Sequence, residues 1–190
     1  RDAKPDLVVI NLAGNQITNF LKQYAEFGLK FPVGGFGFDT ALAWAAGKGN
    51  FVGTWPVVWH HMIDTAGTKA FVGAFTKKYN KPPENQAWGD YIAMKIVAQT
   101  INDLKSLESP KIIEHFEKGA KFDLLKTREG YFRASDHQLM HEMYTVTALP
   151  ADKIKNQWDI FSSGAPVPGP DESLEVIAAT KEENSCTFPT

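Results

Sequence analysis

Residues 6–39, DLVVINLAGNQITNFLKQYAEFGLKFPVGGFGFD, decide the fold expected for this chain. Residues 6–11 are apolar and rich in β-branched side chains, which is typical of a parallel strand buried on both faces. A helical pattern follows and ends at Gly28. A second strand then begins at 31–33 and ends in the loop 34–39. This βαβ unit brings the carboxyl ends of its two strands to one edge of a sheet. Ligand sites of parallel sheets lie at that edge.

The rest of the chain first continues this alternation, which predicts an α/β fold, and then changes in character. Before the change, the patterns predict a helix through 41–45 that stops at 47–49 and has Asp39 or Thr40 as its cap. They then predict a strand at 51–54, an aromatic loop at 55–61, and helices at 66–79, 88–107 and from 109 onward. Beyond residue 122 they predict β-hairpins with strands at 124–125, 131–133 and 139–146, and a short strand at 158–161. The proline-rich end is expected to be a tail.

Composition excludes several classes of protein. The chain has 190 residues, a hydrophobic content of 43% and a net charge of -2, which argues against nucleic-acid binding. No apolar stretch approaches the length of a membrane span, and the chain opens without a signal-peptide pattern, as a mature chain or a fragment does.

The single cysteine, Cys186, rules out an internal disulfide. It is either an ordinary tail thiol or the partner of a cysteine outside this chain.

Four groups of residues, taken in order and spacing over about 5–165, resemble one known family. They are NLAGN (11–15) with NFLKQ (19–23) and FGL (27–29); GGFG (34–37); KKYNKPP (77–83) leading into WGDYIA (88–93); and FRASDHQL (132–139) followed by MY (143–144). Together they resemble the periplasmic solute-binding proteins of ABC transporters, in the branched-chain amino-acid (Leu/Ile/Val-binding) class.

The resemblance implies a type I periplasmic binding fold, in which two parallel-sheet α/β lobes are joined by three crossings and hold the ligand in the cleft between them. This chain matches the C-terminal half only. Residues 5–65 are then part of the second lobe, 66–120 return to the first lobe, 121–165 are a β-rich segment with the last crossing, and 166–190 are a tail. The implied partners are a small-molecule solute, an ABC permease in the inner membrane and the missing N-terminal half. No cofactor is implied, and the implied location is periplasmic or extracytoplasmic with a lipid anchor.

Phe36 carries the expectation about the ligand. In the family's amino-acid binders the matching position holds a glutamate that meets the ligand's ammonium group, and burying an ammonium beside an apolar ring costs several kcal/mol. Gly35 and Gly37 let the backbone approach a ligand closely. The loop therefore favours a small organic anion with an aromatic or branched apolar body. The alternatives are that Phe36 belongs to the core, and that the ligand is a branched-chain amino acid.

The remaining candidate ligand contacts lie in three places. In the first loop, Asn11, Ala13, Gly14 and Asn15 offer an amide and backbone N–H groups to an anionic oxygen, with Ala13 where the family often has tyrosine. Asn15 has the alternative role of a helix cap.

The other two places contain aromatic residues. Trp55 and His60 belong to the aromatic loop, where stacking on a flat ligand competes with packing beneath the hinge. Gln86 and Trp88 lie near a position at which the family contacts its ligand.

Other chemistries are poorly supported. His60, His61 and Asp64 resemble part of a metal site, and His137 and His141 are four residues apart, but a strand would separate those two by about 13 Å. A Gly-x-Ser-x-Gly elbow is absent, as is a complete dinucleotide fingerprint. The sequence therefore predicts a non-catalytic substrate-binding component of an ABC importer that works by hinge closure. A ligand-sensing receptor domain of the same fold is the alternative.

Overall fold

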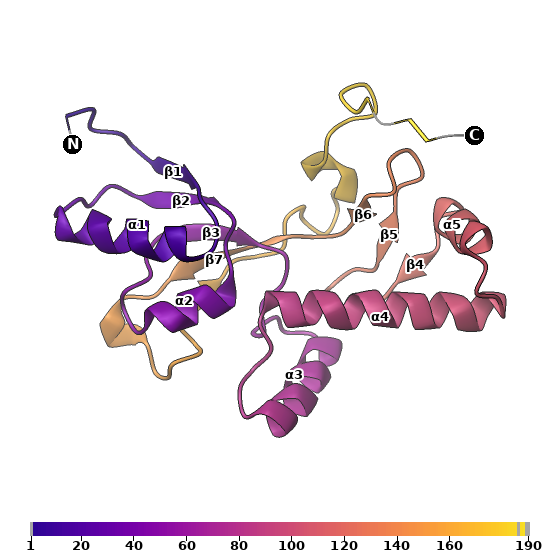
Figure 1. The fold of residues 1–190 in the computed structure, drawn as a ribbon, viewed down its shortest axis with the longest axis horizontal. Coiled ribbons are helices and arrows are strands. Elements are labelled where there is room, and N and C mark those ends of the chain that lie inside the picture. The colour runs from indigo at the N-terminus through magenta and orange to yellow at the C-terminus, as the bar shows by residue number, and fades with distance from the viewer. Residues whose placement is uncertain (1, 186, 189–190) are drawn as a thin grey trace.

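The computed structural model describes residues 2–185 and 187–188, so Cys186 lies outside the described residues. The chain forms two lobes (Figure 1). The first, called the five-stranded lobe, has a sheet of order β1-β2-β3-β7-β8. Its strands are β1 (Val8–Asn11), β2 (Val33–Phe36), β3 (Thr54–Val57), β7 (Tyr144–Ala148) and β8 (Phe161–Ser163), and its helices are α1 (Asn15–Glu26), α2 (Thr40–Ala46) and the 3-10 turn η1 (Ala151–Lys153).

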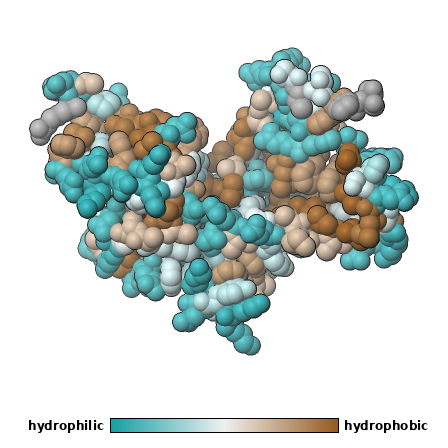
Figure 2. Space-filling view, in the orientation of Figure 1, coloured by the Kyte–Doolittle hydropathy of each residue, from teal (hydrophilic) through white to brown (hydrophobic). Residues whose placement is uncertain are grey.

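The second part, called the helical lobe, surrounds a small antiparallel sheet of order β4-β5-β6. Its helices are α3 (Ala66–Tyr79), α4 (Asn85–Leu104), α5 (Ser109–Glu117) and the 3-10 turn η2 (Leu174–Ile177), and its strands are β4 (Lys121–Phe122), β5 (Gly130–Phe132) and β6 (Leu139–Met140). Figure 2 shows the surface hollowed between the two lobes.

The predicted βαβ unit forms as expected. β1 and β2 are parallel, with Asn11 opposite Phe36 at their carboxyl ends. Between them, α1 buries Ile17, Leu21 and Tyr24, which are spaced four and three residues apart and so share one face of the helix. The edge that carries both strand ends points toward the helical lobe (Figure 1).

The predicted strand at 51–54 is wrong in its position, because β3 spans Thr54–Val57. Trp55 therefore lies on a strand and not in an aromatic loop. A proline within a strand removes one N–H donor, but β3 pairs with β2 at Thr54 alone. Beyond Thr54 only β7 flanks β3, so the missing N–H of Pro56 leaves no gap in a ladder with β2.

The predicted strand at 139–146 is also wrong, because it is two strands in two different sheets. β6 stays in the helical lobe, and β7 joins the five-stranded lobe. His137 does not lie on a strand: it has a φ of 55°, and its backbone N–H donates to the Arg133 carbonyl in a turn. His141 follows β6.

The segment predicted as a tail packs against the helical lobe. After β8 the chain returns there, where η2 forms. Tyr131 Oη donates to Glu175 Oε1 at 2.7 Å, and Arg133 Nη1 donates to the Ala179 carbonyl at 2.9 Å. The polar and proline-rich composition of 166–190 did not indicate these contacts, because their donors come from β5 and from the residue that follows it.

Candidate functional site

Two exposed loops at the carboxyl edge of the parallel strands form the candidate site. Phe36 is 61% exposed, so it does not belong to the core. Asn11, directly opposite Phe36, is exposed too, while Gly35 is half-buried beneath them. The edge thus offers an exposed apolar ring opposite an exposed amide.

The first loop leads into a helix whose N-terminus lacks a side-chain cap. Ala13, Gly14 and Asn15 are exposed. Gly14 occupies the N-cap position with a φ of 56°, and no side chain accepts a hydrogen bond there. The alternative that Asn15 serves as the cap is therefore wrong. The N–H groups of Gln16 and Ile17 donate to the carbonyls of Ala13 and Gly14. The N–H groups at the very start of the helix, those of Gly14 and Asn15, are the ones that suit an anionic oxygen.

Hydrogen bonds join this edge to the helical lobe. Gln86 Nε2 donates to Asp39 Oδ2 at 2.7 Å, and the Thr40 backbone N–H donates to Asn85 Oδ1 at 3.1 Å. Asp39 also caps α2, since its Oδ1 accepts from Ala41 N at 2.7 Å, so it is Asp39 and not Thr40 that serves as the cap. The contact between Asp39 and Gln86 was not predicted, because the two residues are far apart in the sequence.

Trp55 and Trp88 lie in the core rather than on the exposed edge. Trp55 is 0% exposed, and its Nε1 donates to the Val52 carbonyl. Trp88 Nε1 donates to the Leu124 carbonyl at 2.9 Å, and its ring stacks on that of Trp59 at a centroid distance of 6.2 Å. The burial of Trp55 matches the alternative of aromatic packing, and Trp88 is buried as well.

His60 is 1% exposed and uncharged. Its Nδ1 accepts from Met62 N at 3.4 Å, so the ring proton resides on Nε2, which has no partner among the described residues. Burial, and after it the neighbouring His61, lowers the pKa of His60 to about 3. The structure therefore gives His60 no exposed surface for stacking on a ligand.

The histidines form no metal site in the described part of the chain. His61 Nε2 lies 3.0 Å from Asp159 Oδ1, and Asp64 pairs with Lys69 instead. His137 pairs with Glu117, and His141 contacts Lys126. Residues 2–185 and 187–188 contain no group of three His, Cys, Asp or Glu side chains that could hold a metal ion. Within the same ranges, no helix has the length and apolar content to cross a bilayer.

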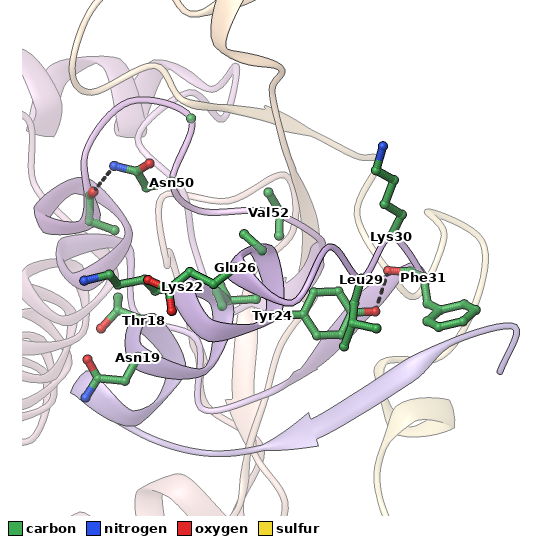
Figure 3. Close-up of a pocket in the computed structure, with 14 residues that line it drawn as sticks. Thr18, Asn19, Lys22, Tyr24, Glu26, Leu29, Lys30, Phe31, Asn50 and Val52 are labelled. Atoms are coloured by element: carbon green, nitrogen blue, oxygen red, sulfur yellow. Dashed lines mark hydrogen bonds between the residues drawn. The ribbon is translucent and has the colours of Figure 1, made fainter. Parts of the chain in front are cut away.

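A groove on the five-stranded lobe lies away from the predicted site. It has a volume of about 690 Å³ and opens between α1 and the segment that follows α2. Figure 3 shows Leu29, Phe31 and Val52 along it, and Tyr24 Oη donates to the Phe31 carbonyl at 3.2 Å. Because Phe31 and Val52 precede β2 and β3, the groove is at the amino ends of the strands. Parallel sheets place their ligands at the opposite edge.

A family model described as a periplasmic binding protein matches residues 1–153. A branched-chain amino acid ABC transporter periplasmic ligand-binding protein from Burkholderia xenovorans LB400 is 28% identical, with a TM-score of 0.74 over 85% of this chain and 43% of its own. A search of curated proteins gives no match.

Two other solved structures share the fold. A solute-binding protein of an ABC transporter from Rhodopseudomonas palustris BisB5, in complex with 3,4-dihydroxybenzoic acid, is 21% identical, with a TM-score of 0.67 over 87% of this chain and 45% of its own. A leucine-binding protein from Thermotoga maritima is 18% identical, with a TM-score of 0.70 over the same shares, 87% and 45%. The chain thus spans less than half the length of these proteins.

Proposed function

The chain belongs to the periplasmic binding protein family, and from that premise we propose that it is the C-terminal half of the solute-binding component of an ABC importer. Its partners are a membrane permease and an N-terminal half that completes the helical lobe. The protein acts outside the cytoplasm, in the periplasm or on a lipid anchor. It is not catalytic: closure of the two lobes buries the solute and forms the surface that the permease recognises.

The ligand class that we propose is a small organic anion with an aromatic or branched apolar body. The observation that carries this proposal is the exposed ring of Phe36, placed opposite Asn11 on the cleft edge. The ring suits an apolar body, whereas the amide of Asn11 and the uncapped start of α1 suit a carboxylate. The backbone groups of Gly14, Asn15 and Gly35 lie in the same two loops and complete the proposed site.

A branched-chain amino acid is the second candidate, and Asp39 favours it. Asp39 lies in the same loop, three residues after Phe36, and both of its carboxylate oxygens accept from neutral donors. Within the described ranges, no cation forms an ion pair with it. A ligand's ammonium would therefore find a negative charge near the cleft.

A matched pair of ligands separates the two candidates. Leucine and 4-methylpentanoate differ only in the α-amino group, so the pair isolates the effect of the ammonium. In the protein that carries both lobes, we expect 4-methylpentanoate or benzoate to raise the melting temperature and to bind in isothermal titration calorimetry. Stabilisation by leucine without any stabilisation by 4-methylpentanoate or benzoate would overturn the organic-anion proposal in favour of the amino acid.

A further inference from the structure

Three segments cross between the two lobes, at 58–65, 141–143 and 164–173 (Figure 1). The second and third crossings pair as an antiparallel ribbon. Met143 N donates to the Val167 carbonyl at 2.7 Å, and Val167 N donates back to the Met143 carbonyl at 2.8 Å. Any rotation of one lobe against the other must therefore bend this ribbon.

A buried carboxylate lies at the helical-lobe end of the ribbon. Glu142 is 1% exposed, and its side chain accepts hydrogen bonds from Thr127 N at 2.8 Å, from Thr127 Oγ1 at 2.7 Å and from the Tyr144 hydroxyl. Burial raises the pKa of Glu142, but these hydrogen bonds outweigh it and hold the pKa below its usual value. Glu142 is therefore ionised at neutral pH, and it fixes the second crossing to the loop between β4 and β5.

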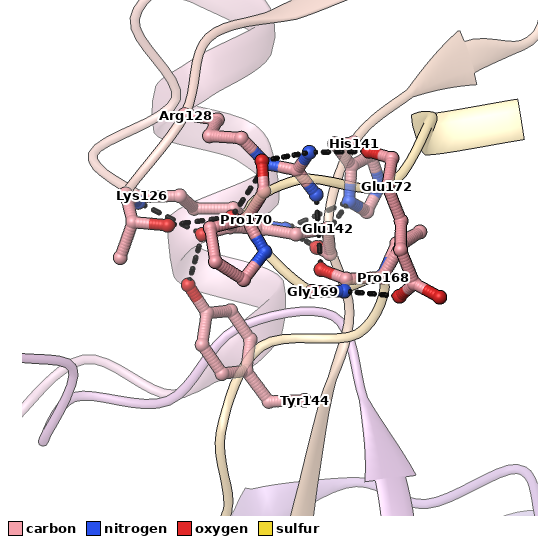
Figure 4. Close-up of polar contacts among 10 residues, drawn as sticks. Lys126, Arg128, His141, Glu142, Tyr144, Pro168, Gly169, Pro170 and Glu172 are labelled. Carbon is pink, nitrogen blue, oxygen red and sulfur yellow. Dashed lines mark hydrogen bonds and ion pairs between the residues drawn. The ribbon is translucent and has the colours of Figure 1, made fainter.

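Arg128, from the same loop, holds the third crossing. Its Nη2 donates to the Pro168 carbonyl at 2.9 Å, and its Nη1 donates to the carbonyls of Glu172 at 2.8 Å and Pro170 at 3.4 Å. Its Nε lies 3.5 Å from Glu142 Oε2. Figure 4 shows the guanidinium between Glu142 and the 168–172 segment. The planar guanidinium of Arg128 thus links both crossings. The compact ammonium of a lysine does not have this reach.

We infer that Arg128 and Glu142, together called the hinge clamp, set how far the two lobes open and thereby tune solute affinity without touching the solute. This inference rests on the proposed function only for its link to affinity. With the clamp intact, the third crossing cannot slide on the helical lobe, so flexing is confined to the ribbon. Loss of the clamp frees that crossing, widens the range of lobe orientations and lowers the fraction of closed molecules. A binding-competent fraction that falls by a given factor raises the apparent Kd by the same factor.

Two titratable side chains, Lys126 and His141, surround the hinge clamp, so the experiment that tests it is done at one fixed pH. Lys126 Nζ donates to the Glu142 carbonyl at 2.6 Å, contacts His141 Nδ1 at 2.7 Å and lies 4.6 Å from the centre of the Trp88 ring. Burial lowers the pKa of Lys126 to about 7, although Glu142 opposes this shift. Burial, and after it Lys126, lowers the pKa of His141 to about 4.

The experiment compares Arg128→Gln, Arg128→Lys and Glu142→Gln in the protein that carries both lobes. The control is Glu114→Gln, which removes the exposed ion pair with Lys118 on α5. Small-angle X-ray scattering without solute gives the radius of gyration, and calorimetry with benzoate gives the Kd. We expect the clamp variants to have a larger radius of gyration than the wild type and a benzoate Kd roughly tenfold weaker, while the control changes neither.

The scattering result stands apart from the proposed function, because it needs no solute. Failure of the wild type to bind benzoate counts against the proposed ligand class, and the radii of gyration still decide the clamp. Arg128→Lys keeps a cation beside Glu142 but lacks the planar guanidinium that donates to several carbonyls. It therefore tests the role of the guanidinium if Arg128→Gln does not fold. Folded clamp variants whose radii of gyration match those of the wild type and of Glu114→Gln would overturn the inference.

Discussion

At the scale of single residues, Phe36 carries the specificity argument and gives the first prediction. In the protein that carries both lobes, Phe36→Glu places a carboxylate beside Asn11, which repels an anionic ligand and attracts an ammonium. We expect the affinity for 4-methylpentanoate to fall at least roughly tenfold and the affinity for leucine to rise, as measured by calorimetry. Phe27→Glu is the matched control, because Phe27 is 71% exposed at the far end of α1. Equal losses in both variants would show that Phe36 does not contact the ligand.

His60 gives a prediction about acid stability. Its pKa is about 3 in the folded chain and 6.5 when unfolded, so between these values the unfolded state binds a proton that the folded state does not. Stability therefore rises with pH through this window, and acidification below 6.5 removes about 1.4 kcal/mol per pH unit for this group. At about pH 5 its contribution to the loss is about 2 kcal/mol.

Denaturant unfolding of wild type and His60→Phe tests this contribution. The phenyl ring keeps the shape of the site and removes both the proton and the unpartnered Nε2, so the variant is expected to lose less stability between about pH 7 and pH 5. His61, whose ring lies 4.4 Å from that of His60, and His141 are present in both proteins, so the difference between the two curves reports on His60. His115→Phe on α5 controls for the loss of an imidazole elsewhere. Parallel pH curves for wild type and His60→Phe would contradict the prediction.

The two strand ends that carry the candidate site were predictable from the sequence, because strand ends are local features. Asn11, Gly35 and Phe36 follow from the positions of two strands and the edge where parallel strands end. Trp55 was assigned to an aromatic loop, and the pairing of β3 with β7 that places it on a strand is visible only in the sheet. The bond between Gln86 and Asp39 had no local signal, since its partners come from different lobes.

At the scale of elements, the contact between β1 and β2 depends on a glycine. Gly35 has a φ of 154°, and a Cβ there would lie 1.9 Å from the Ile10 carbonyl oxygen. Gly35→Ala is therefore expected to destabilise the protein by about 3 kcal/mol or more, as measured by denaturant unfolding. Gly73→Ala is the control, because Gly73 lies exposed on α3 with no atom within 4 Å of an added Cβ. That change is expected to stabilise by about 0.5–1 kcal/mol, and a similar effect of both changes would contradict the close approach.

Elements with local end signals were predicted well, and elements held by long-range pairing were not. The bounds of α3, Ala66–Tyr79, match the prediction, because a proline pair that starts three residues after its end marks that end in the sequence. The break between β6 and β7 has no such mark. It exists because Met143 pairs with Val167 and Glu142 turns toward Thr127, and both partners are distant in sequence.

At the scale of the whole molecule, apolar side chains remain exposed on both lobes. β1 is an edge strand in the described sheet, with Val9 60% exposed on it. On α4, Tyr91, Met94 and Val97 are 45%, 69% and 41% exposed. Exposed apolar surface next to a free strand edge is typical of a surface that another segment covers. Because the chain spans 43–45% of its solved relatives, we propose that their N-terminal half corresponds to the covering segment.

This proposal predicts how the 190-residue chain behaves alone. We expect it to bind a hydrophobic dye such as ANS and to self-associate in analytical ultracentrifugation, whereas the protein with both lobes does neither. Met94→Lys should lower the dye signal of the isolated chain, because it charges the centre of the exposed α4 face. Phe27→Lys is the matched control, since it changes a similarly exposed apolar side chain at the C-terminus of α1. A monomeric isolated chain with no dye binding would show that these faces need no cover, and equal effects of both substitutions would show that α4 is not the covered surface.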